Sequence, residues 1–407
     1  MRDDWRRWLL LVLLLIIAAY SFTTVLPAVL KLGTRGAADF SIFYTGSLIL
    51  RNGLAPHLYD LAVQAHFHSP FYRSHPLPFN HLAFELLLFL PFTTVPFSTA
   101  FWLWNAINVL LLAGFAWLMA PELKSLPRPA GLFILIAALA FFPVIVTLMS
   151  GQDSILLLLI YAVAYLLLKK DKQWLAGFVL AGALIKFPLL IPFVLPFVFR
   201  RQWEFLAGFV VGSAAVVGIS IAITGFSGFL DYFHLLRFLA THPEVGYTNM
   251  GDMPVARGFF ETILPNAPLL RFALVAVLSV ALLAFTTKHF RKGTDEKFNV
   301  WFALNIAMAL VVCPHLYRHD WTVLFLALLL YWNSFLDIRR TDGNSKLMET
   351  GALVTLTITF FATPLYRALN DHDLASLMFI PLLLFCLAVA ASICSFRTNT
   401  KATAEGA

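Results

Sequence analysis

Long apolar runs, broken only by short charged stretches, dominate this sequence. A helix needs roughly 20 apolar residues to cross a bilayer, and many of these runs are that long. The chain is 60% apolar and 13% charged, whereas a soluble domain is about 25% charged. So little charge cannot cover a water-facing surface. A soluble enzyme, a disordered protein and a nucleic-acid-binding protein are therefore excluded, although the pI is 9.3. We predict an all-α polytopic membrane protein that forms one integral membrane domain over residues 1–407.

The apolar runs define the predicted membrane-spanning helices. Segment 82–97 is short and contains two prolines, and segment 174–199 is interrupted by Lys186-Phe187-Pro188, where proline disrupts a helix. Two layouts of twelve spans remain. In the first, 82–97 dips into the membrane and returns, while 174–199 is a hairpin of two short helices turning at Lys186; in the second, each segment crosses once. The clear candidate spans are 8–30, 99–119, 131–149, 153–168, 203–223, 267–287, 298–313, 320–336, 350–366 and 375–394.

The distribution of Lys and Arg favours the first layout, because cytoplasmic loops are enriched in these residues. The first layout places 19 of the 29 Lys and Arg on the cytoplasmic side, whereas the second divides them 14 against 15. About twelve spans, cytoplasmic N- and C-termini, and long outer loops at 31–81 and 224–266 follow. The first span has no convincing cleavage site after it and is expected to be a retained anchor. The expected location is the plasma (inner) membrane, with the active face toward the periplasm or exterior.

Asp39 follows the first span and begins a stretch with helical spacing, from Phe40 to Leu50. This stretch is predicted to be an amphipathic helix lying at the outer membrane surface. A carboxylate at that position either caps the helix N-terminus or acts as a general base at the membrane–water boundary. The residues alone leave both readings open.

Cationic and imidazole side chains gather on the predicted outer face. Charged groups near the hydrocarbon boundary are costly, which favours a functional reading. Lys186, at a hairpin tip, either snorkels to the surface or binds an anion, for which a lipid phosphate is the natural candidate. The guanidinium of Arg257 suits phosphate oxygens. His315, His319 and Asp320 are metal-ligand types without an HExxH-like pattern, so phosphate contact or hydrogen bonding is favoured and no metal or cofactor is predicted.

Several motifs resemble the polyprenol-phosphate-sugar-dependent glycosyltransferases of family 87, which have the GT-C membrane fold. The resemblance runs over most of the chain, and its motifs follow the family's order. They are Asp39-Phe40 through Tyr44, then Gly53 and Leu58-Tyr59-Asp60; Gly151-Gln152 with the basic loop 169–172, Ala176-Gly177 and Lys186-Phe187-Pro188; Met253-Pro254 with Arg257-Gly258; and Pro314-His315 with Asp320. One departure is that the family often has Pro-Pro before the second apolar segment, where this chain has Leu82-Ala83-Phe84-Glu85. The resemblance therefore assigns no role to His81 or Glu85.

The resemblance implies a reaction and a set of partners. Enzymes of this family move a sugar, typically mannose, from a polyprenyl-phosphate donor to an acceptor hydroxyl at the outer leaflet, with inversion. Their catalytic base is an aspartate of the first outer loop, which corresponds to Asp39. Arg257, Lys186 and His319 are candidates to stabilise the departing phosphate. The implied partners are the lipid-linked donor, a glycan or glycolipid acceptor and membrane lipids. The residues expected at the substrate are Tyr44, Gln152, Lys186, Arg257, His315, His319 and Asp320.

Two other functions fit many spans and outer-face chemistry. A transporter or flippase of a lipid-linked or anionic solute would also use broken helices and membrane-embedded cations. However, no internal repeat relates the two halves, and the ionisable groups lie toward one face instead of the bilayer midplane. A ligase acting on a different lipid-linked donor is the third possibility. If the transferase prediction is right, Asp39, Arg257 and Asp320 should line one cavity.

Overall fold

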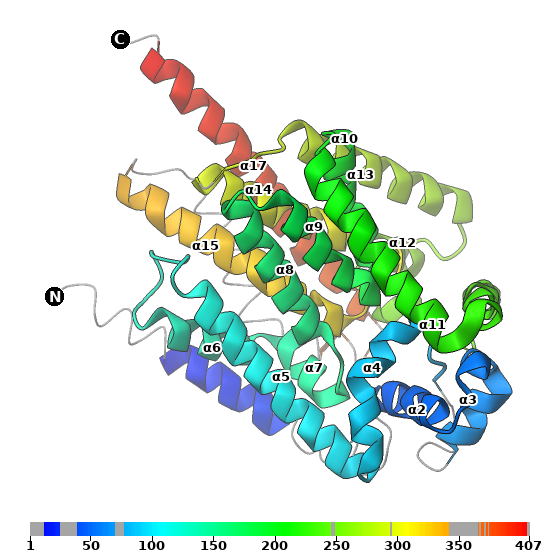
Figure 1. Ribbon diagram of the computed structural model, residues 1–407. Helices are drawn as coiled ribbons and strands as arrows, with labels where there is room; N and C mark the ends of the chain where they lie inside the picture. The colour runs from blue at the N-terminus through cyan, green and yellow to red at the C-terminus, as the bar shows by residue number, and fades with distance from the viewer. Residues whose placement is uncertain are drawn as a thin grey trace.

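The computed structural model is a bundle of helices, shown in Figure 1. It describes residues 12–24, 39–69, 77–245, 249–293, 295–341, 365, 368–369, 372 and 374–404, and these contain no β-strand. The predicted all-helical fold is therefore confirmed for these residues. The α-helices are α2 (Phe40–Arg51), α3 (Leu61–His68), α4 (Leu86–Phe89), α5 (Phe97–Met119), α6 (Ala130–Ala140), α7 (Phe142–Ser150), α8 (Ser154–Lys169), α9 (Gln173–Leu180), α10 (Phe187–Phe199), α11 (Trp203–Thr241), α12 (Ala256–Ile263), α13 (Pro268–Lys288), α14 (Glu296–Val312), α15 (Leu324–Thr341) and α17 (Phe379–Ala404). Short 3-10 helices are η1 (Ala55–His57), η2 (Ala83–Glu85), η3 (Leu90–Thr94), η4 (Ala181–Lys186), η5 (Met250–Asp252), η6 (Arg318–Val323) and η7 (Ala375–Met378).

Helix α14 lies at the centre of the bundle, and the outer helices turn apolar side chains outward. Every residue of α14 from Phe298 to Val311 is buried, and α10, α13, α15 and α17 pack around it. On the outer helices, by contrast, Trp117 is 76% exposed and Leu269 is 85% exposed. Proteins whose surface faces water rarely expose so many large apolar side chains. These surfaces are therefore expected to face lipid.

The number of membrane crossings is confirmed only in part. Five helices are long and apolar enough to cross, or six if α6 and α7, which meet at a bend of 69°, count as one span. Helix α8 and the helix Val12–Thr24 are apolar but shorter. The predicted span 350–366 lies outside the described residues. The total of about twelve spans thus stays a prediction.

The segment 173–199 doubles back on itself, although its length and composition alone would allow a single crossing. At its start, a Cβ on Gly177 would lie only 2.0 Å from the carbonyl oxygen of Phe205, in α11. Near its end, the ring of Phe197 stacks on that of the same Phe205, with centroids 4.1 Å apart. Twenty residues of straight helix span about 30 Å, so one residue can touch both only if the chain turns between them. This confirms the predicted hairpin, and at Lys186 the backbone leaves the helical conformation, with φ at −129° and ψ at 60°.

The segment that follows the first long loop does not cross the bundle. Its η2, α4 and η3 cover only Ala83–Thr94, which is too short for the roughly 30 Å of a hydrocarbon core. The backbone N–H of Phe84 bonds to Ser220 in α11, and the carbonyl of Thr93 accepts from Arg51 in α2. The segment is thus held at one end of the bundle, as the favoured layout requires.

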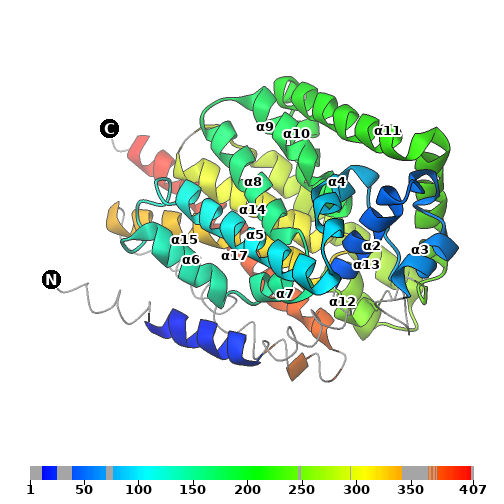
Figure 2. The same ribbon diagram turned by 60° about the horizontal axis from the view of Figure 1, so that its bottom comes forward.

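Two predicted elements differ from expectation. Helix α2 forms as predicted from Phe40, but eight of its 12 residues are buried, so it packs inside the protein instead of lying on a membrane surface. Helix α11 extends to Thr241, well into the predicted loop 224–266, and its two halves meet at a kink at Gly225, where φ is 72°. The helices α2, α3 and the second half of α11 gather at one end of the bundle (Figures 1 and 2). Residues of α2 and of the second half of α11 line a cavity there.

Candidate active site

A cavity of about 900 Å³ lies at this end of the bundle and receives side chains from seven separate parts of the chain. Asp39, Arg257 and Asp320 all line it, so the predicted convergence of these three residues is confirmed. Of the other residues expected at the substrate, Gln152, Lys186, His315 and His319 also line it. The structure brings these groups together but does not test their roles.

Tyr44 is the predicted site residue that the structure does not bring to the cavity. Its side chain is buried, and its ring packs against those of Phe40 and Phe97. The hydroxyl donates a hydrogen bond of 2.8 Å to the carbonyl oxygen of Val95. Tyr44 therefore ties α2 to the turn before α5. It was expected at the substrate, but it belongs to the packing beside the cavity.

Asp39 faces the cavity instead of capping a helix. It precedes α2, but its side chain makes no capping hydrogen bond, so the capping reading is wrong. Its Oδ2 instead accepts a hydrogen bond of 3.0 Å from Nε2 of Gln152, 113 positions along the chain. This hydrogen bond orients the carboxylate at the cavity wall.

The turn that carries Gln152 is built around a glycine. Gly151 ends α7 in the left-handed conformation, with φ at 66°, which costs other residues free energy. A Cβ there would lie 2.7 Å from that of Phe40. Trp104 and Asn108, both in α5, donate hydrogen bonds to the carbonyl oxygens of Gly151 and Gln152. The amide of Gln152 is thus directed at Asp39 by its own turn.

The cation of Lys186 is paired within the cavity. Its Nζ lies 3.4 Å from Oδ1 of Asp320, and Nε2 of His319 lies 3.4 Å from the same oxygen. The backbone N–H of Tyr317 donates to the other oxygen, Oδ2, at 3.2 Å, and Ser154 donates to Oδ1 at 3.3 Å. Asp320 therefore serves as a fixed anchor that positions Lys186 and His319.

Arginines stand nearer the solvent. Arg257, exposed in the first turn of α12, approaches the carbonyl oxygen of Pro314 at 3.5 Å. Arg318, less exposed, lines the same cavity together with Asp252. The cavity therefore offers a carboxylate base candidate on one wall and three cationic side chains on others, with apolar side chains of α2, α10 and α11 between them.

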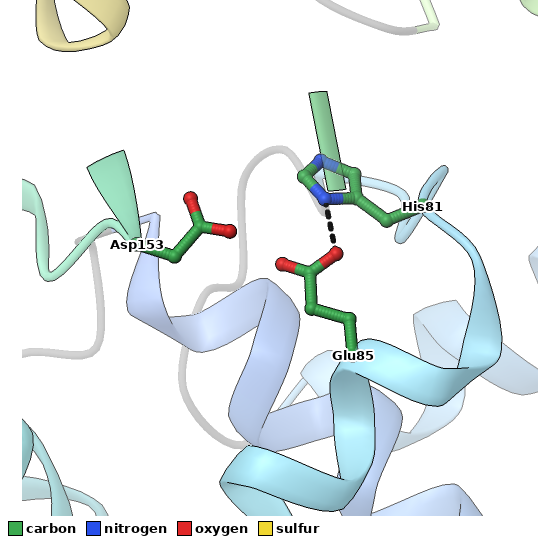
Figure 3. A group of neighbouring side chains, drawn as sticks. All are labelled: His81, Glu85 and Asp153. Atoms are coloured by element: carbon green, nitrogen blue, oxygen red, sulfur yellow. Dashed lines mark hydrogen bonds and ion pairs between the residues drawn. The ribbon is translucent and has the colours of Figure 1, made fainter. Parts of the chain in front are cut away.

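A second polar cluster was not part of the predicted site. It consists of His81, Glu85 and Asp153, shown in Figure 3. Nδ1 of His81 and Oε2 of Glu85 are 2.7 Å apart. Glu85 ends the short η2, and Asp153 directly precedes α8, so both lie outside the spanning helices. Burial, opposed by Lys186, raises the pKa of Glu85 to about 7. Burial and the neighbouring Glu85 carboxylate likewise raise the pKa of Asp153 to about 7.

A signal for this cluster is present in the sequence. Glu85 lies within the apolar segment 82–97, and a lone carboxylate in such a run is costly unless something pairs with it. The partner is 68 positions away, and no local pattern points to it. His81, the third member, also lines the cavity.

A helical membrane bundle with a polar cavity at one end defines a membrane protein that handles a partly polar substrate. A sequence profile of glycosyltransferase family 87 matches residues 83–314. The chain belongs to this family. It is therefore a glycosyltransferase, and so an enzyme instead of a transporter or flippase. The match includes Gln152, Lys186 and Arg257; Asp39 lies before it and Asp320 after it. No curated protein and no solved structure shows significant similarity to the chain.

Proposed function

We propose that this enzyme moves mannose from a polyprenyl-phosphate donor to a hydroxyl of a glycan or glycolipid acceptor, with inversion at the sugar. The observation that carries the proposal is that a carboxylate held by Gln152 shares one cavity with the cations of Lys186 and Arg257. A general base and stabilising charges are the two things that such a transfer needs. Apolar side chains in the cavity wall, such as Leu236 and Leu239 of α11, suit the lipid part of the donor.

The proposed reaction is a single displacement in which each bond is accounted for. The acceptor oxygen attacks the anomeric carbon while its proton passes to the carboxylate of Asp39. The bond between that carbon and the phosphate oxygen breaks, and its electron pair leaves with the polyprenyl phosphate. Lys186 and Arg257 stabilise the charge that develops on the departing oxygen. No metal or other cofactor takes part in these steps.

We further propose that the cavity opens toward the periplasm or exterior of the plasma (inner) membrane. Lys169, Lys170, Arg200 and Arg201 lie at the ends of α8 and α10, opposite the end of α10 that adjoins Lys186 and the cavity. Cytoplasmic ends are enriched in Lys and Arg, which supports this orientation. With α9 and α10 counted separately and 350–366 included, about twelve crossings in one membrane domain fit the same orientation.

The test is transfer by purified protein in lipid nanodiscs. Polyprenyl-phosphate-mannose, the matching glucose donor and a pyrophosphate-linked donor are each supplied with a panel of glycan and glycolipid acceptors. We expect transfer from the mannose donor, and a loss of about 10²- to 10⁴-fold for Asp39→Asn, the usual contribution of a general base. Asp171→Asn, at the opposite end of the bundle, is the matched control and should be unaffected.

Each other result has a definite meaning. Transfer from the pyrophosphate-linked donor alone would identify a ligase and refute the phosphate donor. Transfer from the glucose donor alone would refute mannose. Undiminished transfer by Asp39→Asn would remove this residue as the base.

A further inference from the structure

The three side chains of the second cluster come from two elements that meet at the cavity floor. His81 precedes η2, Glu85 ends it, and Asp153 directly precedes α8. One ligand atom from each residue lies within 4.8 Å of the other two. In Figure 3 the carboxylates of Glu85 and Asp153 and the imidazole of His81 point toward one another.

Asp153 is the most unusual member, because it is a buried carboxylate without a donor. Its side chain is 0% exposed, and among the described residues neither oxygen has a hydrogen-bond partner. It does not cap α8. Oε1 of Glu85 is likewise buried without a partner in the described chain. A buried carboxylate left in this state costs several kcal/mol of folding free energy. The site is therefore suited to a ligand that several carboxylate oxygens can contact at once.

The charges around the cluster show what is needed. Glu85 and Asp153 repel each other when both are ionised. Lys186 is near enough to favour both, but its ammonium is 3.4 Å from Oδ1 of Asp320. Glu85 and Asp153 thus share with Asp320 an ammonium that Asp320 already engages. A divalent cation supplies the charge that balances them.

We propose that His81, Glu85 and Asp153 bind a divalent transition-metal ion, Zn²⁺ or Mn²⁺. One imidazole nitrogen and two carboxylates form a ligand set that suits these ions better than Ca²⁺, which prefers oxygen alone. Metal–ligand bonds of about 2.0–2.2 Å at tetrahedral angles place the ligand atoms about 3.4 Å from one another. The separations here therefore close onto an ion with side-chain shifts of under about 1 Å. The hydrogen bond between His81 and Glu85 is replaced by bonds of both residues to the ion.

The ion joins two parts of the fold. It fastens the segment around η2 to the start of α8, next to the turn that holds Gln152. Through His81, which lines the cavity, it also adds positive charge to the cavity floor. Binding needs no sugar donor, so this proposal stands or fails separately from the proposed function.

The experiment measures metal binding by the full-length protein without a polyhistidine tag. After treatment with a chelator, the protein is titrated with Zn²⁺, Mn²⁺ or Mg²⁺ in nanodiscs; bound metal is counted by mass spectrometry, and the melting temperature is followed. We expect about one Zn²⁺ or Mn²⁺ per chain and a rise in melting temperature on loading. Asp153→Asn and Glu85→Gln should each weaken binding at least about tenfold. In metal-free buffer both variants should melt no lower than the wild type, because each removes a buried charge.

A matched control is Asp231→Asn, which removes an exposed carboxylate 3.4 Å from a histidine, His234, on α11. This variant should bind metal like the wild type. Two outcomes overturn the proposal: a wild-type protein that binds neither Zn²⁺ nor Mn²⁺ in a saturable way, or a stoichiometric site that Asp153→Asn and Glu85→Gln leave intact. Stoichiometric binding of Mg²⁺ alone would refute the assignment to a transition metal.

Discussion

Replacing Gln152 by leucine removes the amide that donates to Asp39 and leaves a branched apolar side chain that is one atom shorter. The bond is 3.0 Å long, and its acceptor is a carboxylate. A hydrogen bond to a charged group is worth about 1.5–3 kcal/mol. If that energy keeps Asp39 aligned with the acceptor hydroxyl, Gln152→Leu should lower kcat by about 10- to 150-fold. Donor KM should change little, because the amide need not touch the lipid phosphate.

The assay is a double-mutant cycle on mannosyl transfer in nanodiscs. Gln152→Leu, Asp39→Asn and the double variant are compared, with Gln202→Leu near the start of α11 as the control for the same substitution far from the cavity. Because Gln152 acts through Asp39, the double variant should be no slower than Asp39→Asn alone. Additive losses would refute the positioning role. So would a Gln152→Leu enzyme with wild-type kcat.

Two further predictions concern residues around the site. Gly151→Ala should destabilise the protein by about 1–3 kcal/mol, because alanine is strained at this left-handed position and has no room for its methyl group; it should also lower kcat by displacing Gln152, and both effects are measured by thermal unfolding and transfer assays. Tyr44→Phe should cost about 1 kcal/mol of stability through the lost hydrogen bond to Val95 and leave kcat unchanged. A large loss of kcat at unchanged stability would return Tyr44 to the active site.

The sequence predicted those features that follow from local composition. Apolar length indicated the membrane class, and Lys186 followed by proline inside an apolar run indicated the hairpin. The common cavity of Asp39, Arg257 and Asp320 followed from loops assigned to one face. Each of these depends on hydropathy and on the distribution of charge along the chain, which a single sequence contains.

The remaining features depend on tertiary packing. The hydrogen bond that Gln152 donates to Asp39 joins residues 113 positions apart. The sequence alone therefore could not exclude that Asp39 caps a helix. The burial of α2 depends on the aromatic rings of Phe89 and Phe101 packing against Phe40, which its own periodicity does not reveal. The polar cluster was missed because Glu85 and Asp153 become neighbours only when η2 packs beside α8.

The spread of the cavity residues along the chain has a consequence for biosynthesis. Asp39 enters the membrane early, Lys186 midway, and Asp320 only after α14 has been made. Until then the ammonium of Lys186 lacks its ion pair with Asp320, and an incompletely paired cation at that depth is costly. A nascent chain interrupted before η6 therefore contains the candidate base Asp39 and the cation of Lys186, but not Asp320, which positions that cation. We therefore expect the enzyme to become catalytically competent late in synthesis, after α14 and η6 have been made and most of the chain has been inserted.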